Sequence, residues 1–303
     1  MPVGILLLPL ATLLRESTGP DKALDIPGLA LASGGLLGVV WGLIHGNGDG
    51  WSSPSIVGAL LVGALLLAAF VAWELRTPQP MLPMRFFRNR AFAAANGASL
   101  LMYFGMFGSI FLLSQFFQTA QGYSPLGAGL RILPWTLMPM FVAPIAGALS
   151  DRIGGRPLMA TGLALQAVGL AWIAAVSTAT VGYVSFVAPF ILSGIGMALF
   201  FAPVANVVLS AVRPSEEGKA SGTNNSIREV GGVLGVAVMA SIFVSYGGYE
   251  SPETFSDGIV PALWVGAAVI GAGSLVSLLI PRKSRSVPVS EHEPELVPQL
   301  EAA

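Results

Sequence analysis

The sequence has no cysteine and few charged residues. Of its 303 residues, 10% are Asp, Glu, Lys or Arg, whereas a soluble globular domain contains about 25%. Without cysteine the chain cannot form a disulfide framework or a thiol-based metal site. Its two histidines, His45 and His292, stand far apart, so we expect no metal centre. The formal net charge of −1 does not favour binding to nucleic acid.

The motifs of common enzyme classes are also missing. The sequence contains no phosphate-binding loop, no dinucleotide fingerprint and no Ser-His-Asp arrangement. We therefore expect a protein that is not an enzyme and that uses no cofactor.

Most of the sequence is apolar. Hydrophobic residues make up 54% of the chain, which also has 37 Gly and 22 Pro, and both are commoner in membrane helices than in soluble ones. A helix needs roughly 20 apolar residues to cross the hydrocarbon core of a bilayer. Eight segments meet this requirement: Ile26–His45, Ser55–Leu75, Phe92–Phe117, Ala128–Ser150, Leu158–Val176, Tyr183–Ala211, Val230–Tyr246 with part of the preceding polar stretch, and Val260–Ile280. The sequence thus predicts an all-α, polytopic membrane helical bundle.

The two ends of the chain differ from these segments. The apolar run Val3–Leu14 would be only about 18 Å long as a helix, too short to cross, and it lacks the basic segment and cleavage site of a signal peptide. We interpret it as the cytoplasmic end of a helix whose beginning is missing. The predicted organisation is a helix remnant and linker at 1–25, a two-helix insert at 26–75, a cytoplasmic linker with an interfacial segment at 76–91, a six-helix bundle at 92–280 and a disordered cytoplasmic tail at 281–303.

Basic residues fall on one side of the predicted membrane. When the gaps between the eight segments are numbered alternately, every Lys and Arg except Arg131 falls in the same set of gaps or in the two tails. The other set contains acidic residues instead, namely Asp49, Glu250, Glu253 and Asp257. By the positive-inside rule the basic side is cytoplasmic. We therefore expect both termini in the cytoplasm.

One cytoplasmic gap carries a long motif, Gly147-Ala148-Leu149-Ser150-Asp151-Arg152-Ile153-Gly154-Gly155-Arg156-Pro157. Gly147 would let a neighbouring helix approach closely, and Asp151 would accept hydrogen bonds at a helix N-terminus, where the dipole favours an anion. Arg152 and Arg156 would bind lipid headgroups, and Gly154 permits a tight turn. The plain alternative is an ordinary charged loop.

This motif resembles the cytoplasmic loop signature of the major facilitator superfamily, which occurs between the second and third helices of each half. Other features resemble the fourteen-helix drug:proton antiporter family within it. They are Asp25-Ile26-Pro27-Gly28, Trp51-Ser52, Glu74-Leu75-Arg76, Pro80-Met81-Leu82, the polar and small residues from Gln118 to Pro134 and, at the start of the penultimate helix, Glu217 to Gly222 with Arg228, Gly231, Gly232 and Gly235. The resemblance extends from about residue 1 to about residue 282.

The resemblance implies the C-terminal half of a major facilitator fold with two extra central helices, in the cell membrane of a bacterium. It implies export of hydrophobic or cationic drugs by alternating access, with the proton gradient as the energy source. The loop motif would act as a conformational latch through Gly147, Leu149, Asp151, Arg152, Gly154 and Arg156. The chain would then start inside the sixth helix, and the N-terminal half of the transporter would be missing here. A truncated product, a mis-assigned start codon and half of a split transporter are all compatible with this pattern.

Polar groups within membrane helices are candidate substrate contacts, because burying them in lipid is costly. The candidates for the substrate cavity are Asn96, Phe104, Phe107, Phe111, Gln115, Gln118, Arg131, Gln166 and Asn206. Arg131 either extends to the outer headgroups or faces a cavity. The amides are equally suited to hydrogen bonds between helices, and the aromatic residues, with the methionines beside them, could equally face lipid.

Two other functions remain open on the sequence. One is a membrane half-bundle that does not transport and needs a second polypeptide. The other is a transporter of a different substrate, such as a lipid precursor, a siderophore or an amino acid.

Overall fold

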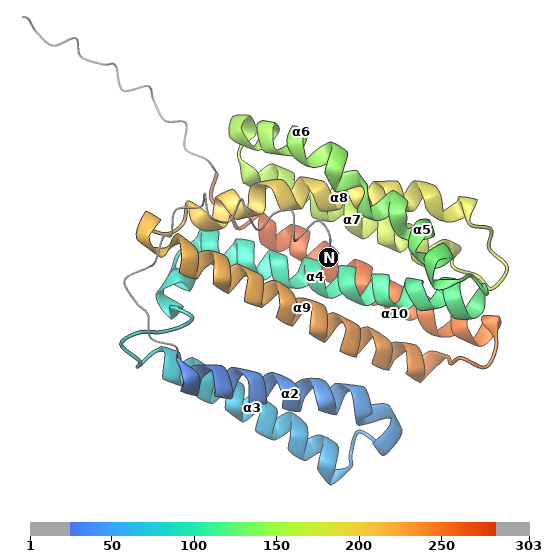
Figure 1. Cartoon of the computed structure of the whole chain (residues 1–303), viewed down its shortest axis with the longest axis horizontal. Coiled ribbons are helices and arrows are strands. Elements are labelled where there is room, and N and C mark those ends of the chain that lie inside the picture. The colour runs from blue at the N-terminus through green and yellow to red at the C-terminus, as the bar shows by residue number, and fades with distance from the viewer. Residues whose placement is uncertain (1–24, 283–303) are drawn as a thin grey trace, which may run out of the picture.

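The computed structural model describes residues 25–282, which form a bundle of long helices (Figure 1). The long helices are α2 (Ile26–Asp49), α3 (Pro54–Glu74), α4 (Arg90–Gln115), α5 (Pro125–Thr136), α6 (Met138–Ile153), α7 (Gly155–Val176), α8 (Val184–Leu209), α9 (Glu217–Tyr246) and α10 (Pro252–Ser277). The short segments η1 (Met84–Arg88), η2 (Phe116–Ala120) and η3 (Pro214–Glu216) connect or extend them. Within this range eight spans are long and apolar enough to cross a membrane, α5 and α6 forming one of them. The predicted number of membrane helices is confirmed, whereas the predictions for residues 1–24 and for the tail from residue 283 lie outside the described residues.

Polar caps and proline mark where several helices begin. The side chains of Asp25, Ser53, Ser124 and Ser251 each accept a hydrogen bond from a backbone N–H in the first turn that follows. Proline stands at the first or second helical position after each of them, where its missing N–H removes no helical hydrogen bond. Each such cap contributes about 1 kcal/mol. The polar residues between the apolar runs therefore set the ends of these helices.

Helices α2 and α3 form a hairpin that lies beside α9 (Figure 1). The two helices approach closely because Gly63 has no side chain: a Cβ there would lie 2.7 Å from the backbone nitrogen of Val39. Asn47 at the end of α2 donates hydrogen bonds to the carbonyl oxygen of Ser241 on α9 at 2.6 Å and to its hydroxyl at 3.1 Å. These bonds join the hairpin to the rest of the bundle.

Proline divides the fourth span. We predict one helix over Ala128–Ser150, but the structure has α5 and α6 meeting at Leu137. Pro139 has no N–H to donate to the carbonyl of Trp135 one turn earlier. Gly194 on α8 fits against the break, because a Cβ there would collide with that same carbonyl oxygen. The single predicted helix is therefore wrong in detail, although the span itself is present.

Helix α9 begins earlier than the sequence predicts. We place most of it at Val230–Tyr246, whereas the structure begins it at Glu217. Arg228 therefore lies within helix α9, about 17 Å along the helix axis from Glu217, and not in a loop. The first turns of α9 are polar, and hydropathy alone does not detect them.

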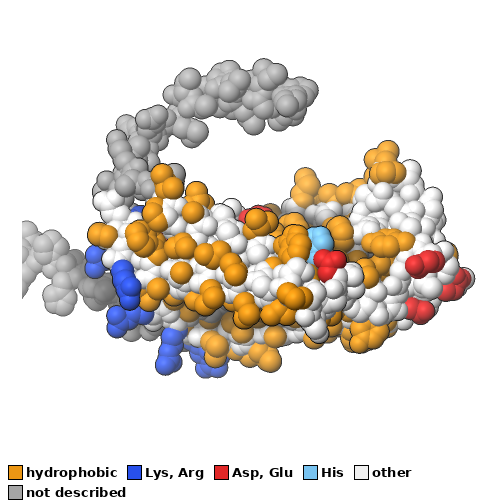
Figure 2. Space-filling view, turned by 90° about the horizontal axis from the view of Figure 1, so that it is seen from below, with side chains coloured by type: hydrophobic (Ala, Val, Ile, Leu, Met, Phe, Trp, Pro, Cys, Tyr) orange, Lys and Arg blue, Asp and Glu red, His pale blue; other side chains and the backbone are white. Residues whose placement is uncertain are grey.

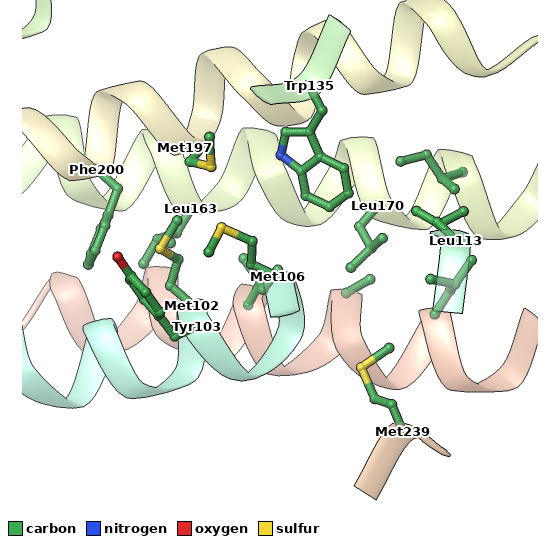
Figure 3. Close-up of a cluster of buried hydrophobic side chains, with 14 of the residues drawn as sticks. Met102, Tyr103, Met106, Leu113, Trp135, Leu163, Leu170, Met197, Phe200 and Met239 are labelled. Atoms are coloured by element: carbon green, nitrogen blue, oxygen red, sulfur yellow. The ribbon is translucent and has the colours of Figure 1, made fainter. Parts of the chain in front are cut away.

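Aromatic, Leu and Met side chains fill the interior of the bundle (Figure 3). Met102 and Met106 from α4, Met197 from α8 and Trp135 from α5 all belong to this cluster. Their exposed fractions are between 0% and 6%. The flexible, polarisable thioethers suit the irregular gaps between helices. These methionines therefore belong to the core and not to an open cavity wall.

Charged side chains separate towards the two ends of the helices. Figure 2 shows Lys and Arg gathered at one end of the molecule and most of the visible Asp and Glu towards the other. At the basic end, Arg85 of η1 forms an ion pair with Glu216 of η3. The linker before α4 is thereby joined to the connection between α8 and α9.

Candidate functional site

A cation lies among aromatic rings inside the span. The guanidinium carbon of Arg228 on α9 is 4.4 Å from the centre of the Tyr103 ring on α4 and 5.6 Å from that of Phe201 on α8. Such contacts contribute about 0.5–1 kcal/mol at exposed sites and more when desolvated. The Nε atom of Arg228 is buried and has no hydrogen-bond partner among residues 25–282. Three helices therefore converge on one charged group.

Aromatic rings continue along α4 beyond this cation. Tyr103 stacks on Phe107 with 5.5 Å between the ring centres, and Phe111 follows one turn later on the same face. Phe107 and Phe111 are 41% and 40% exposed. Gly232 on α9 borders Phe107, where a Cβ would lie 3.3 Å from the ring. Together with Phe201, these three rings form what we call the aromatic shelf.

Phe104, another predicted cavity residue, lies at the contact between α4 and α9. A Cβ at Gly235 would collide with the Phe104 carbonyl oxygen, and a Cβ at Gly231 would lie 2.5 Å from that of Leu100. The glycines of the motif in α9 thus have two different roles. Gly231 and Gly235 allow close helix packing, whereas Gly232 borders the shelf.

Asn96 is buried between the same two helices and is hydrogen-bonded there. Nδ2 of Asn224 donates to Oδ1 of Asn96 at 3.0 Å and to the Ser99 hydroxyl at 3.2 Å. Nδ2 of Asn96 donates to the Phe92 carbonyl at 2.9 Å. In this arrangement the Asn96 amide joins α4 to α9. The sequence leaves two roles open for this amide, a hydrogen bond between helices and a substrate contact, and the structure has the first.

Gln115 and Gln118 lie at the far end of α4, where the helix passes into the π-helical segment η2. Gln115 accepts a hydrogen bond from the Tyr249 hydroxyl at 2.8 Å, and Gln118 donates to the Ser114 carbonyl at 3.1 Å. Burial raises the pKa of Tyr249, and the hydrogen bond to Gln115 opposes this by a smaller amount. The spacing of the two glutamines predicts a shared face of an α-helix, but a π turn contains more residues than an α turn. Gln115 and Gln118 therefore bind different partners.

Arg131 forms a second site with aromatic rings at the start of α5. Its guanidinium carbon lies 3.3 Å from the centre of the Tyr123 ring and 5.4 Å from that of Tyr183. Nη1 donates to the Gly127 carbonyl at 3.0 Å, and the Tyr183 hydroxyl donates to the Arg131 carbonyl at 3.1 Å. Burial raises the pKa of Tyr183, and the charge of Arg131 lowers it by less. Arg131 thereby connects the start of α5 to the start of α8.

The predicted latch motif joins α6 to α7 at the basic end of the molecule. Gly154 ends α6 with φ of 85°, a left-handed conformation that favours glycine. Asp151, Gly154 and Arg156 line a cavity of about 1120 Å³. Asn206 on α8 lines the same cavity, so it lies at the basic end and not on the aromatic shelf.

The remaining motif residues lie on the outside of the described structure. Leu149 and Arg152 are exposed. No residue between 25 and 282 comes within 4 Å of a Cβ placed on Gly147. The close helix approach that we expect at Gly147 is therefore not made within this part of the chain.

Gln166 is fully buried in α7, and neither atom of its amide group has a hydrogen-bond partner among residues 25–282. It faces α8, because a Cβ at Gly196 would lie 2.6 Å from the Gln166 backbone nitrogen. The Ser193 hydroxyl on α8 is also buried without a partner in the described chain. Gln166 therefore belongs to the interior of the bundle. In the same range no three His, Cys, Asp or Glu side chains are grouped closely enough to hold a metal ion.

Sequence reasoning did not select Asn224 or Tyr249, which are hydrogen-bond partners of Asn96 and Gln115. The signal for Asn224 was present in its spacing. Asn224, Arg228, Gly231 and Gly235 recur every three or four residues, which places them on one face of a helix. This pattern is recognised only if the predicted helix begins at the polar residues near 217, where α9 begins in the structure.

The architecture and these sites define a multi-pass helical membrane protein. Residues 95–301 match the family model of the Major Facilitator Superfamily. Because the match covers more than half of the chain, this protein belongs to the major facilitator superfamily.

Individual relatives agree with this assignment. The chain is 30% identical over 265 residues to the tetracenomycin C resistance and export protein of Streptomyces glaucescens, covering 86% of this chain and 49% of that protein. It is 30% identical over 248 residues to the multidrug resistance protein Stp of Mycobacterium tuberculosis, covering 81% and 46%. It is also 30% identical over 281 residues to the lincomycin resistance protein of Streptomyces lincolnensis, covering 92% and 57%. The chain therefore spans about half the length of the curated relatives it matches.

Proposed function

We propose that this chain forms one helical bundle of a secondary transporter that exports hydrophobic compounds in exchange for protons. The observation that carries the proposal is the similarity, over most of the chain, to proteins named for drug resistance and export. The exposed rings Phe107 and Phe111 offer an apolar surface to such compounds. In transporters of this kind the substrate site lies near the membrane midplane, at the interface between repeats. Exchange for protons follows from the resemblance to drug:proton antiporters.

The proposal includes an arrangement in the membrane. Helices α2 and α3 would be the central insert of a fourteen-helix transporter, and the helices from α4 to α10 its C-terminal six-helix bundle. The end that carries most of the Lys and Arg (Figure 2) would face the cytoplasm of a bacterial cell. A second bundle, accounting for the greater length of the relatives, would complete the substrate pathway.

The loop motif would close this pathway on the cytoplasmic side. Asp151 and Arg156 line the cavity at the basic end, and Gly154 sets the turn between α6 and α7. A change in how the two bundles meet would break the contacts of this motif and open the cytoplasmic side. The Asp151→Asn variant should then transport less while inserting in the membrane normally.

Export by cells tests the proposal. A bacterial host that lacks its own drug pumps would produce the full chain, alone and together with the part of the tetracenomycin C relative that the chain does not cover. Accumulation of the neutral dye Nile red and of the cation ethidium would be followed by fluorescence. We expect accumulation to fall in at least one arrangement and to recover when a protonophore is added.

Two controls make the result decisive. Asp151→Asn should weaken export at an equal amount of protein in the membrane. The full-length relative, produced in the same host, shows that the assay detects export. If the relative lowers dye accumulation and neither arrangement of this chain does, the chain is not an exporter bundle and the non-transporting half-bundle is favoured.

A further inference from the structure

Arg228 lies well inside helix α9, beside Tyr103 of α4 and Phe201 of α8. It lies about 17 Å from the start of α9 at 1.5 Å per residue. On the same estimate, Tyr103 lies about 20 Å from the start of α4 and Phe201 about 12 Å from the end of α8. A charged group within a membrane helix is costly and is usually paired with another group. We therefore expect a group close to this guanidinium that neutralises its charge.

No residue between 25 and 282 forms an ion pair with Arg228. Glu229, its neighbour in the sequence, is exposed; its charge acts on the guanidinium electrostatically, but the two side chains form no ion pair. The rings of Tyr103 and Phe201 attract the positive charge through their faces. They leave Nε without a hydrogen-bond acceptor. The charge is therefore held by the protein without an ion-pair partner among residues 25–282.

The surface beside the cation suits a flat apolar group. Phe107 and Phe111 continue from Tyr103 on the same face of α4, and both are about two-fifths exposed. Gly232, one turn along α9 from Arg228, has no side chain to cover Phe107. A ring can therefore lie against the shelf while a substituent reaches the guanidinium.

We propose that Arg228 and the aromatic shelf bind planar aromatic compounds that carry an acidic group, such as a carboxylate or a sulfonate. The planar donors of a guanidinium match two oxygens of such a group, and aromatic rings stack with an offset on Phe or Tyr. The same positive charge repels cations, so the site favours acids over the cationic drugs that the family resemblance implies. This inference rests on the proposed function and names the substrate class of that transporter.

Binding to the purified full chain in lipid nanodiscs tests the proposal. Three probes share one ring system: 1-naphthoate is acidic, 1-naphthamide is neutral, and 1-naphthylmethylammonium is cationic. Titration calorimetry gives the affinity of each. We expect naphthoate to bind about tenfold more tightly than naphthamide, as a hydrogen bond to a charged group allows, and the ammonium to bind most weakly.

Variants separate the charge from the shelf. Arg228→Gln should abolish the difference between naphthoate and naphthamide while naphthamide still binds. Phe111→Ala should weaken both by a similar factor, because it removes stacking and leaves the charge. Arg213→Gln makes the same charge change at an exposed loop position and should preserve the acid preference. Circular dichroism and elution volume verify that each variant is folded.

Several results would overturn the proposal. They are equal binding of acid and amide, an acid preference that survives Arg228→Gln, and the absence of binding by all three probes. Loss of the preference when the part of the tetracenomycin C relative that this chain does not cover is supplied would show that a protein carboxylate neutralises Arg228 instead. Dye export by cells is measured separately, so the proposed function can stand while this inference fails.

Discussion

Asn224 of α9 donates a hydrogen bond to Asn96 of α4 at 3.0 Å, and both side chains are buried. Arg228, Gly231 and Gly235 follow Asn224 on the same face of α9. The contact between these helices thus combines a polar pair, a cation and two positions without a side chain. The polar first half of α9 therefore contributes to a helix face that lies in the interior of the bundle.

Replacing Asn224 with Ala should lower the free energy of unfolding by about 1–2 kcal/mol, because the Asn96 carbonyl and the Ser99 hydroxyl lose their buried donor. Unfolding of the chain in mixed micelles with increasing dodecyl sulfate measures this change. Asn225→Ala is the matched control, since Asn225 is exposed on the same helix and its loss should change little. Equal effects of the two substitutions would contradict a role for the buried pair.

Gly235→Ala should destabilise the chain by about 1–3 kcal/mol through overpacking. The new methyl group would collide with the Phe104 carbonyl oxygen, and backbone cannot move aside as a flexible side chain can. The same unfolding assay detects the loss. Gly222→Ala on the same helix meets no atom within 4 Å, so it should be neutral or stabilising by up to about 1 kcal/mol, as helix propensity predicts. If Gly235→Ala behaves like Gly222→Ala, then α4 and α9 do not pack as described.

Gly154→Ala should cost about 1–3 kcal/mol, because its φ of 85° with ψ of 161° lies in a region that only glycine adopts readily. The apparent melting temperature should fall, and trypsin should cleave faster after Arg152 as the turn loosens. Gly147→Ala provides the comparison, since it lies in the same motif within α6 and has open space around it. A larger loss at Gly147 than at Gly154 would argue against the turn geometry.

Stability at alkaline pH should depend on Tyr249. Burial raises the pKa of its phenol above the ordinary value of 10.0. Because the folded state holds the proton more tightly than the unfolded state, the associated stability is complete below pH 10 and is lost as pH rises through the folded pKa. The melting temperature should therefore decline above pH 10.

Tyr249→Phe should reduce the steepness of that decline. At pH 8 the same variant should be less stable by about 1 kcal/mol, because Gln115 loses its hydrogen-bond donor. Tyr246→Phe, at a ring that is 68% exposed while that of Tyr249 is 51% exposed, controls for loss of a phenol and should leave stability at pH 8 unchanged. Melting curves with the same pH slope for Tyr249→Phe and the unchanged chain would refute the prediction.

Helix positions could be predicted where apolar runs end abruptly, and less well where a helix continues into polar residues. The predicted Ile26–His45 has the observed start of α2 because Asp25 caps it. The last helix is predicted from Val260 but begins at Pro252. Its first turns contain Ser251 and Thr254, which cap each other's backbone, and a hydropathy criterion discards such residues although they are good helix starts.

The candidate site could be predicted in part. The sequence predicts Phe107 and Phe111 as cavity residues, and both are exposed on one face of α4; their contact with substrate stays a proposal. Asn96 is predicted in the same role, yet its partner Asn224 lies 128 positions away in the sequence. Nothing in the local sequence of either residue indicates that pairing.

The single sequence was sufficient for the number of membrane spans and for the separation of basic from acidic gaps. Both depend on local properties: the length of an apolar run must match the bilayer, and basic residues partition to one side. The placement of Arg228 against Tyr103 and Phe201 needed the folded bundle. It depends on where α9 begins, on how each helix is rotated about its axis, and on the close approach of α4 and α9 at Gly231 and Gly235. Those relations join residues far apart in the chain, so packing establishes them and the composition of a segment does not.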